Sequence, residues 1–393
     1  MKKKLEINIF NTDLVWMGMV DDVESLVHRT SWHEIPYSEM TISKSAQGVH
    51  ELQIGRILVV NNQKDKALII EDISATLDDE YIHFTMVSLK GMLNYRICHP
   101  NLAGTFTQKR TSEVMMIIPY NNLISNTGDE HRKFLDSTGT INMFVVAEIK
   151  VFGDTIDFTV DWETGYIGDA ITTVAKMYGV DTTVPLGWNV YLKHDYTRYI
   201  MDVWYGTHRH IHQTTNNPVI FSEEFGNIAN ASYEYSIKDW RNVAYINWQE
   251  EITNAEGKKE KVQRVNWLGN SANGITKSFN RKEIILKSNK GIESEVLAEG
   301  RSELNKRPHV ESFTAEILDI GTTMTTYGKD WNIGDIVTVQ SKSVLKDKLI
   351  SIDAQITEIE ETYADGEYSI NATFGEGRLS VFQLIKQSIE QKK

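Results

Sequence analysis

A short β-rich phrase occurs twice in the sequence with only a few changes. Residues 53–60 read QIGRILVV, and residues 332–339 read NIGDIVTV. In each copy a glycine, Gly55 or Gly334, stands just before a run of β-favouring residues, and the two glycines are 279 positions apart (334 − 55). Glycine adopts a positive φ without steric strain. Both phrases therefore predict a tight turn that opens a β-strand.

Two more strands are predicted after each phrase. Asn- and Asp-containing turns separate the strands of the first copy, and ADGE precedes the last strand of the second. The shared order predicts an antiparallel meander in each copy and favours duplication, although the pattern I-G-x-I-x-x-V by itself is a common way to start a strand. The predicted strands are residues 56–60, 67–73 and 81–87 in the first copy and 335–339, 349–361 and 368–374 in the second.

Alternate residues of a strand point to opposite faces of its sheet. Ile57, Val59, Ile336 and Thr338 share one face, and Leu58, Val60, Val337 and Val339 share the other. In the first copy both faces are apolar, which predicts a sheet that is covered on both sides. The candidate structural residues are Gly55, Ile57, Val59, Gly334, Ile336 and Val339.

Helical spacing of apolar residues marks three other stretches. These are residues 166–179, residues 294–307 and a closing helix at 379–393. Leu384 and Ile385 belong to the apolar stripe of the closing helix, which must be covered because a helix this short is marginal in water. The chain is thus predicted to be mainly β, with a mixed α/β insertion between the two copies.

Composition limits the function classes. The 393 residues are 41% hydrophobic and 24% charged, which is typical of a globular chain of several domains. The formal net charge of −13 disfavours binding to nucleic acid or anionic lipid. The longest purely apolar run, VMMII at residues 114–118, is too short to span a bilayer, and the N-terminus does not read as a signal peptide. We therefore expect synthesis in a cytoplasm and no membrane span.

Three histidines at alternate positions suggest a metal site. His208, His210 and His212 would share one strand face, but ligands from a flat strand diverge, and a metal site usually recruits a ligand from elsewhere in the chain. A solvated or interface strand face is the favoured interpretation. Cys98 is the only cysteine, so a cysteine-cluster metal site is excluded, and we expect no metal and no cofactor.

Catalytic interpretations are also weak. The acidic stretch at residues 154–163 has Asp154, Asp157, Asp161 and Glu163. Carboxylates along a strand more often form its solvent-exposed face than a glycosidase pair. Cys98 and His99 are sequence neighbours that point to different faces, which disfavours a thiol nucleophile. The aromatic stretch at residues 188–205 is typical of a core or a protein interface, with sugar stacking as the alternative. We expect no catalytic residues.

Several phrases resemble a known family. They are MGMVDDVESLVHRTSW, LQIGRILVVNNQKDKALIIEDI, LKGMLNYRI, NPVIFSEEFGNIANASYEYSIKDWRNVAYI, DWNIGDIVTVQ and ITEIEETYADGEYSINATFGEG. In this order they resemble the amino-terminal hub region of the tail-associated lysin (Tal) family, the baseplate hub proteins of phages of Gram-positive hosts. The loop near Pro36 departs from the family pattern. Many family members continue into a fibre or a lytic domain, so no lysin activity is carried over to this chain.

The resemblance implies a structural hub at the tail tip or baseplate of a virion, a phage or tailocin particle. It implies two tube-type antiparallel β-barrels per chain, a homotrimer that meets a hexamer of the distal tail protein, the tape-measure C-terminus inside the tube, and a downstream fibre or receptor-binding protein. The alternative function is a cell-wall carbohydrate-binding or peptidoglycan-degrading tail protein. The expected domains are a first barrel at 1–100, an α/β insertion at 101–235 that can partly return to the first barrel, a second barrel at 236–378 with a helical excursion near 294–307, and the helix at 379–393.

Overall fold

The computed structural model shows two compact units. Unit 1 comprises Met1–Ala175, Val184–Ser232 and Thr314–Gly375, and unit 2 comprises Lys176–Thr183, Tyr233–Phe313 and Glu376–Lys393. The structure describes residues 5–99, 102, 104–125, 129–160, 165–177, 186–269, 279, 281–305, 307, 310–318, 326–342 and 349–376. The predicted closing helix, with Leu384 and Ile385, lies outside these residues. No helix in the described part of the chain has the length and apolarity needed to span a membrane.

The first copy of the repeated pattern forms the predicted meander. This part of the chain has the strands β1 (Ile7–Phe10), β2 (Trp16–Val20), β3 (Val23–Ser31), β4 (Tyr37–Ser43), β5 (Ile57–Val60), β6 (Leu68–Ser74) and β7 (Tyr81–Ser88), of which β5, β6 and β7 form the meander. β5, β6 and β7 pair antiparallel in sequence order, with Ile69 opposite both Ile57 and Val87. Short 3-10 turns occur at η1 (Val49–Glu51), η2 (Lys64–Lys66) and η3 (Leu89–Tyr95).

The second copy forms a meander in the same order. Its strands are β19 (Ile336–Lys342), β20 (Leu349–Ala364) and β21 (Glu367–Glu376). β19 pairs antiparallel with β20, and β20 pairs antiparallel with β21. All six strands predicted from the two phrases are therefore confirmed.

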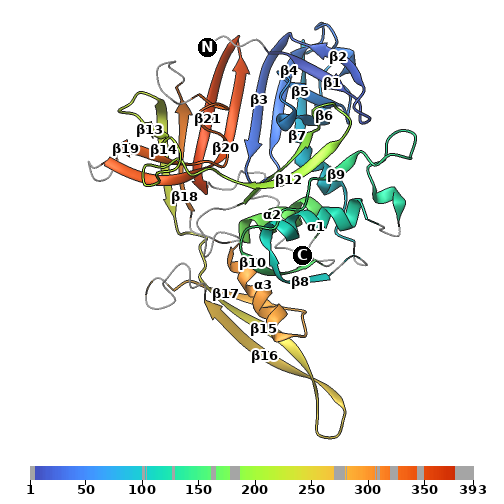
Figure 1. Cartoon of the computed structure of the whole chain (residues 1–393), viewed down its shortest axis with the longest axis vertical. Helices are drawn as coiled ribbons and strands as arrows, with labels where there is room; N and C mark the ends of the chain where they lie inside the picture. Colours follow the sequence, from blue (N-terminus) through green and yellow to red (C-terminus); the bar gives the residue numbers. More distant parts are fainter. Residues whose placement is uncertain are drawn as a thin grey trace. The chain divides into compact units, whose positions relative to one another are not determined.

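The two copies join in one sheet. β20 pairs antiparallel with β3, which places Glu361 opposite His28 and Tyr363 opposite Leu26, so the red and blue strands lie side by side in Figure 1. Three further strands belong to this sheet: β13 (Ile220–Ser222), β14 (Ile228–Ser236) and β18 (Val310–Ile317). The main path of the 13-stranded sheet runs from β14 to β2 and stays open among the described strands. The mainly β prediction is confirmed, whereas the described sheet is not a closed barrel.

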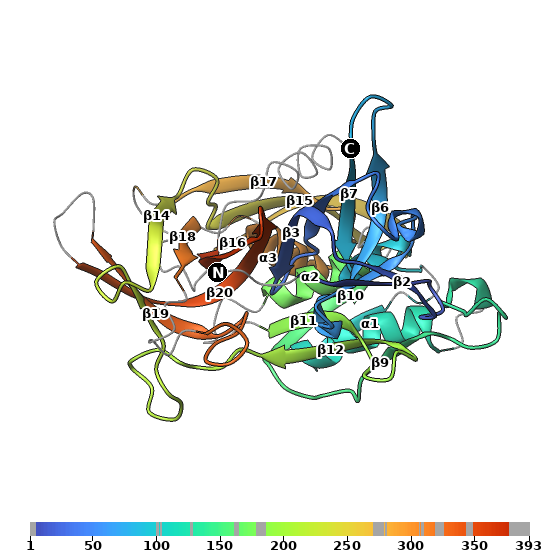
Figure 2. The same ribbon diagram turned by 90° about the horizontal axis from the view of Figure 1, so that it is seen from above.

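The insertion supplies helices and small sheets that pack on the first meander. Its elements are β8 (Gly104–Arg110), α1 (Thr111–Leu123), η5 (Glu130–Arg132), β9 (Phe144–Val146), β10 (Thr155–Val160), α2 (Ile167–Met177), β11 (Leu186–Leu192) and β12 (Tyr199–Tyr205). The predicted amphipathic helix at 166–179 is confirmed as α2. The sequence did not predict α1, because its apolar residues surround the helix instead of forming one stripe. Figure 2 shows α1 close to β12, against which it packs.

Strand β5 separates two hydrophobic cores. Ile57 and Val59 belong to the core shared with α1, α2, β11 and β12. Leu58 and Val60 belong to a second core with β1, β4 and β7. All four side chains are buried, so the predicted covering of both sheet faces is confirmed in the first copy. Burial on both faces explains why this strand reads as a continuous apolar run.

The described part of unit 2 contains a small sheet that is covered by a helix. β15 (Val243–Thr253) lies between β16 (Lys259–Gly269), which is antiparallel to it, and β17 (Glu283–Lys287), which is parallel. α3 (Glu293–Asn305) covers this sheet through a core that includes Ile246 and Val296. The helix predicted at 294–307 is therefore confirmed over its described length. The expected domain boundaries at residues 100, 235 and 378 stay predictions.

Candidate functional site

Each repeated phrase forms a turn that we call a glycine turn, residues 53–56 in the first copy and 332–335 in the second. Gly55 has a φ of 81° and Gly334 a φ of 88°, as the sequence predicted. The amide of Gly55 donates to the carbonyl of Ile70 at 2.9 Å, and that of Gly334 donates to the carbonyl of Ile356 at 2.7 Å. The two glycines therefore make the same contact with the neighbouring strand.

The remaining backbone bonds of the two glycine turns also correspond. The amide of Arg56 donates to Gln53 at 3.1 Å, and the amide of Asp335 donates to Asn332 at 3.2 Å. The carbonyls of Arg56 and Asp335 in turn accept a bond from the partner strand, at 3.0 and 2.9 Å. The similar sequences of the two glycine turns thus correspond to similar backbone geometry.

The surroundings of the two glycine turns differ. A Cβ built on Gly55 meets no heavy atom of the described residues within 4 Å, whereas one on Gly334 lies 2.3 Å from the indole of Trp32. Trp32, 2% exposed, also lies against Gly187 of β11, where an added Cβ would be 2.4 Å from the same ring. Trp32 therefore packs against both the insertion and the second glycine turn.

The apolar candidates after each glycine are buried. Ile57 is 2% exposed, Val59 0%, Ile336 9% and Val339 1%. Thr338 is also fully buried, and its hydroxyl donates to Asp353 at 2.6 Å, so this buried polar group has a hydrogen-bond partner.

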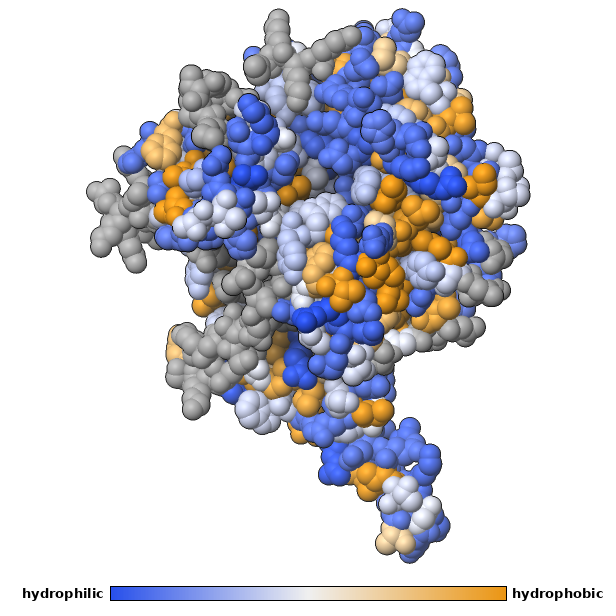
Figure 3. All heavy atoms as spheres, viewed as in Figure 1, coloured by the Kyte–Doolittle hydropathy of each residue, from blue (hydrophilic) through white to orange (hydrophobic). Residues whose placement is uncertain are grey.

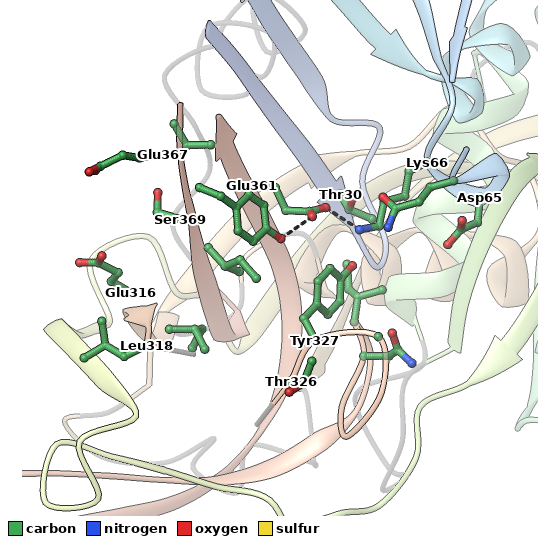
Figure 4. Close-up of a pocket in the computed structure, with 18 of the residues that line it drawn as sticks. Thr30, Asp65, Lys66, Glu316, Leu318, Thr326, Tyr327, Glu361, Glu367 and Ser369 are labelled. Atoms are coloured by element: carbon green, nitrogen blue, oxygen red, sulfur yellow. Dashed lines mark hydrogen bonds and ion pairs between the residues drawn. The ribbon is translucent and has the colours of Figure 1, made fainter. Parts of the chain in front are cut away.

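An open cleft lies beside the second copy. Its volume is about 1260 Å³, and residues of the first copy, the insertion and the second copy line it (Figure 4). Aromatic and amide side chains are prominent in the lining, among them Tyr191, Trp204, Tyr327, Tyr368, Asn189 and Asn332. The sequence singled out Tyr191 and Trp204 as part of the aromatic stretch. Trp188 of the same stretch is instead 1% exposed and belongs to the core.

A buried ion pair forms part of the cleft wall. Lys66 Nζ lies 2.5 Å from Glu361 Oε2, and the side chains are 7% and 1% exposed. The Nδ1 atom of His28 is 3.6 Å from the same oxygen, and Tyr368 donates its hydroxyl to Glu361 Oε1 at 2.7 Å. Figure 4 shows Tyr327 next to Lys66, whose ammonium lies 4.2 Å from the ring centre. The pair connects η2 of the first copy to β20 of the second.

The environment of Glu361 keeps its carboxylate ionised. Burial opposes ionisation, but the hydrogen bond with His28 and the charge of Lys66 outweigh it, so the pKa of Glu361 lies well below its usual range. Burial, followed by the neighbouring Glu361 charge, raises the pKa of Tyr368. A general acid or base works best with a pKa near the operating pH. These two groups are shifted away from that range, which fits a structural role.

A second buried cation holds the segment after β3. The ammonium of Lys90, 2% exposed, donates to the carbonyl oxygens of Ser31, Trp32 and Glu34 at 2.7, 3.3 and 3.1 Å. It also lies 4.7 Å from the ring centre of Trp188. Burial lowers the pKa of Lys90 to about 7, while the charge of Glu34 opposes the shift. The sequence carried no signal for this contact, because nothing in LKGML marks its lysine as buried.

The weaker candidates from the sequence have different outcomes. Asp161, Glu163 and the side chain of Asp157 lie outside the described part of the structure. Cys98 is buried at 1% exposure. In contrast, His210 and His212 meet at one carboxylate, that of Asp353 on β20.

Known proteins identify the family. The family model described as siphovirus ReqiPepy6 Gp37-like protein matches residues 6–376. No curated protein sequence matches the chain. The 43 kDa tail protein of prophage MuSo2 from Shewanella oneidensis is similar in structure, with a TM-score of 0.54 and 11% identity over 95% of this chain and 98% of that one. The tail protein from Neisseria meningitidis MC58 is also similar, with a TM-score of 0.51 and 10% identity over 95% and 97% of the two chains.

Identities this low establish a shared fold, whereas the family model covers nearly the whole chain. The resemblance to phage tail proteins inferred from the sequence is thereby confirmed. Because one family model extends from β1 to the end of β21, the chain belongs to the siphovirus ReqiPepy6 Gp37-like protein family and has a fold found in tail proteins.

Proposed function

We propose that this chain is the hub of a phage tail tip or baseplate. In this role it closes the distal end of the tail tube and connects the ring of the distal tail protein to the host-contacting tip. The chain is then a structural component of the virion and needs no catalytic residue. The family assignment and the likeness to two tail proteins support a tail component. The repeated glycine turns support the more specific hub role.

The observation that carries the hub role is the correspondence of the glycine turns at Gly55 and Gly334. Similar φ values and corresponding backbone contacts give each chain two similar structural copies. Three chains that each carry two copies match a ring of six partner subunits. We therefore propose a homotrimer docked on a hexamer of the distal tail protein, with the tape-measure C-terminus inside and a fibre or receptor-binding protein below.

The proposed domains are two tube-type barrels, residues 1–100 and 236–378, that hold the insertion 101–235 between them. The pairing of β3 with β20 supports a continuous wall through both copies of one chain. In the open sheet, β2 is one end of the path and is available for closure by further contacts in an assembled ring. The net charge of −13 suits a tube that passes DNA without binding it.

Native mass spectrometry tests the stoichiometry. The full-length chain is mixed with the distal tail protein of the same particle, and the expected complex contains three hub and six partner chains. A complex of one hub chain with one partner chain would overturn the proposal. The variant Ile54→Asp sharpens the test, since Ile54 lies in the first glycine turn and is 60% exposed. If this turn faces the partner ring, the variant keeps its melting temperature and loses the complex.

The second candidate function is carbohydrate binding, and the aromatic lining of the cleft favours it. Aromatic faces and amide groups are typical of sugar sites. However, the hydroxyl of Tyr368 already donates a hydrogen bond to Glu361, and the Lys66 ammonium already lies over the ring of Tyr327. Both groups are therefore engaged in contacts within the protein. A cell-wall pull-down with the full-length chain separates the two functions. If the wild type is retained on cell walls and Trp204→Ala is not, the result supports sugar binding. If the wild type and Trp204→Ala are both retained only weakly and to the same extent, the result supports the hub function alone.

A further inference from the structure

The segment after β12 is fixed alongside β19. The amide of Ile336 donates to the carbonyl of Thr207 at 2.9 Å, and the amide of Arg209 donates to the carbonyl of Ile336 at 2.7 Å. His208 and Ile336 form a parallel bridge. Beyond this bridge the chain leaves the strand conformation and turns at Ile211 and His212. The histidines therefore do not lie on one flat strand.

The turn directs two imidazoles to one carboxylate. The Nδ1 atom of His210 lies 3.2 Å from Asp353 Oδ2, and the Nδ1 atom of His212 lies 2.6 Å from the same oxygen. Each of the three residues offers a ligand atom, and these atoms all lie within 4.8 Å of one another. Asp353 comes from β20, 141 positions after His212, so the third donor has a different origin in the chain.

Neighbouring side chains orient these donors. The hydroxyl of Thr338 donates to Asp353 Oδ1 at 2.6 Å, which leaves Oδ2 to face the histidines. The Nε2 atom of His210 lies 3.3 Å from Nδ1 of His208. When His210 donates from Nε2, its Nδ1 carries the lone pair that a metal needs. A second partner that fixes the tautomer of a ligating histidine is the usual arrangement in metal sites.

We propose that His210, His212 and Asp353 bind one divalent transition-metal ion of the zinc class. Two imidazole nitrogens and one carboxylate oxygen suit zinc, cobalt or nickel better than calcium or magnesium, which prefer oxygen ligands. The side chain of His212 is 69% exposed, so water has access to complete the coordination. The ion replaces the proton between His212 Nδ1 and Asp353 Oδ2. On metal binding, His210 Nδ1 gives up the 3.2 Å hydrogen bond that it accepts from the His212 amide.

Such an ion would clamp the segment after β12 to the second copy. It would join that turn to β20, next to the β19 strand that already holds the segment by backbone bonds. Because imidazole and carboxylate groups bind a metal ion only when they are deprotonated, zinc affinity should be lower in acid. A metal that binds the folded state also raises the melting temperature.

Zinc titration of the untagged full-length chain tests the proposal. The protein is treated with EDTA, dialysed and titrated with zinc chloride at pH 7.5 by isothermal calorimetry, with cobalt absorption spectra as a second readout. We expect one ion per chain and a higher melting temperature with zinc. Asp353→Asn and His210→Ala should weaken binding by at least ~100-fold, and Thr338→Val by ~10–100-fold, as for residues that orient a ligand.

His50→Ala is the matched control. His50 Nε2 also lies near a carboxylate, 3.4 Å from Glu51, but it has no second imidazole in that contact, so its loss should leave zinc binding unchanged. Circular dichroism of the metal-free variants verifies that each one is folded; Asp353→Asn is nearly isosteric and keeps the Thr338 contact. Absence of saturable binding by the wild type, or equal binding by Asp353→Asn, would overturn the proposal.

Discussion

The indole of Trp32 lies against the α-carbon of Gly334 so closely that a methyl group there would be 2.3 Å from the ring. Trp32 directly follows β3 in the first copy, and Gly334 directly precedes Asp335 and strand β19 in the second. The amide of Trp32 also donates to the carbonyl of Thr357 in β20 at 2.9 Å. One aromatic side chain thus connects the two copies, and this contact distinguishes the two glycine turns.

Alanine substitutions should reveal this difference. Gly55→Ala meets open space and should lower the free energy of unfolding by about 1–2 kcal/mol, because a left-handed backbone strains any residue with a Cβ. Gly334→Ala adds a clash with a fully packed indole, so its loss should be larger by a further ~1–3 kcal/mol. Urea denaturation measures both values. Equal losses would show that the contact with Trp32 is unimportant; as a control, Trp32→Leu should relieve part of the Gly334→Ala effect.

Removal of the buried carboxylate of Glu361 should strongly destabilise unit 1. Glu361→Gln leaves Lys66 buried without its counter-charge, at an expected loss of about 3–5 kcal/mol. Because the folded-state pKa of Glu361 is lowered, its contribution is fully present above the unfolded-state pKa, about 4.3, and is lost as the pH falls below it. Urea denaturation between pH 3 and 7 should show the gap between wild type and variant shrinking in acid.

The neighbouring residue on β20 provides the control for Glu361. Glu360, whose side chain is 35% exposed, pairs with the partly exposed Arg29 at 2.8 Å. Glu360→Gln should therefore change stability by less than about 1 kcal/mol. A loss in Glu360→Gln as large as that in Glu361→Gln would contradict the importance of burial.

The buried Lys90 should make the free energy of unfolding depend on pH in the alkaline range. Its folded-state pKa is lowered to about 7, so between there and the unfolded-state pKa, about 10.4, the unfolded chain binds more protons than the folded one. Unfolding free energy should then rise with pH by up to about 1.4 kcal/mol per pH unit relative to Lys90→Met, which lacks the titrating group. Thermal or urea unfolding at pH 7.5 and 9.5 measures the difference. A constant gap between the two proteins would refute the lowered pKa.

A charge in either apolar strand should prevent assembly. Ile57→Asp and Ile336→Asp each place a carboxylate at a side chain that is 2% or 9% exposed, with an expected loss of several kcal/mol. Both should abolish the complex with the distal tail protein in native mass spectrometry. Leu77→Asp is the control because Leu77 is 100% exposed, and it should assemble as the wild type does. Normal complexes in either core variant would indicate that the two copies do not act as equivalent parts of a ring.

The local parts of this fold can be predicted from short windows of sequence. The six strands, the positive φ of Gly55 and Gly334 and the burial of both faces of β5 all follow from turn chemistry and side-chain alternation within a few residues. Helix α2 follows from its one apolar stripe. Helix α1 was missed for the opposite reason, since its apolar residues surround the helix and form no single stripe.

Contacts between residues far apart in the chain could not be predicted in this way. The pairing of β3 with β20, the contact of Trp32 with Gly334 and the ion pair of Lys66 with Glu361, 295 positions apart, are invisible in any short window of sequence. The histidines show the same limit. Their alternation predicted diverging imidazoles, whereas a turn and a carboxylate from β20 bring two of them together. Local patterns fix backbone conformation and which face is buried, but long-range partners are chosen by the packing of whole elements, which depends on every residue in the core at once.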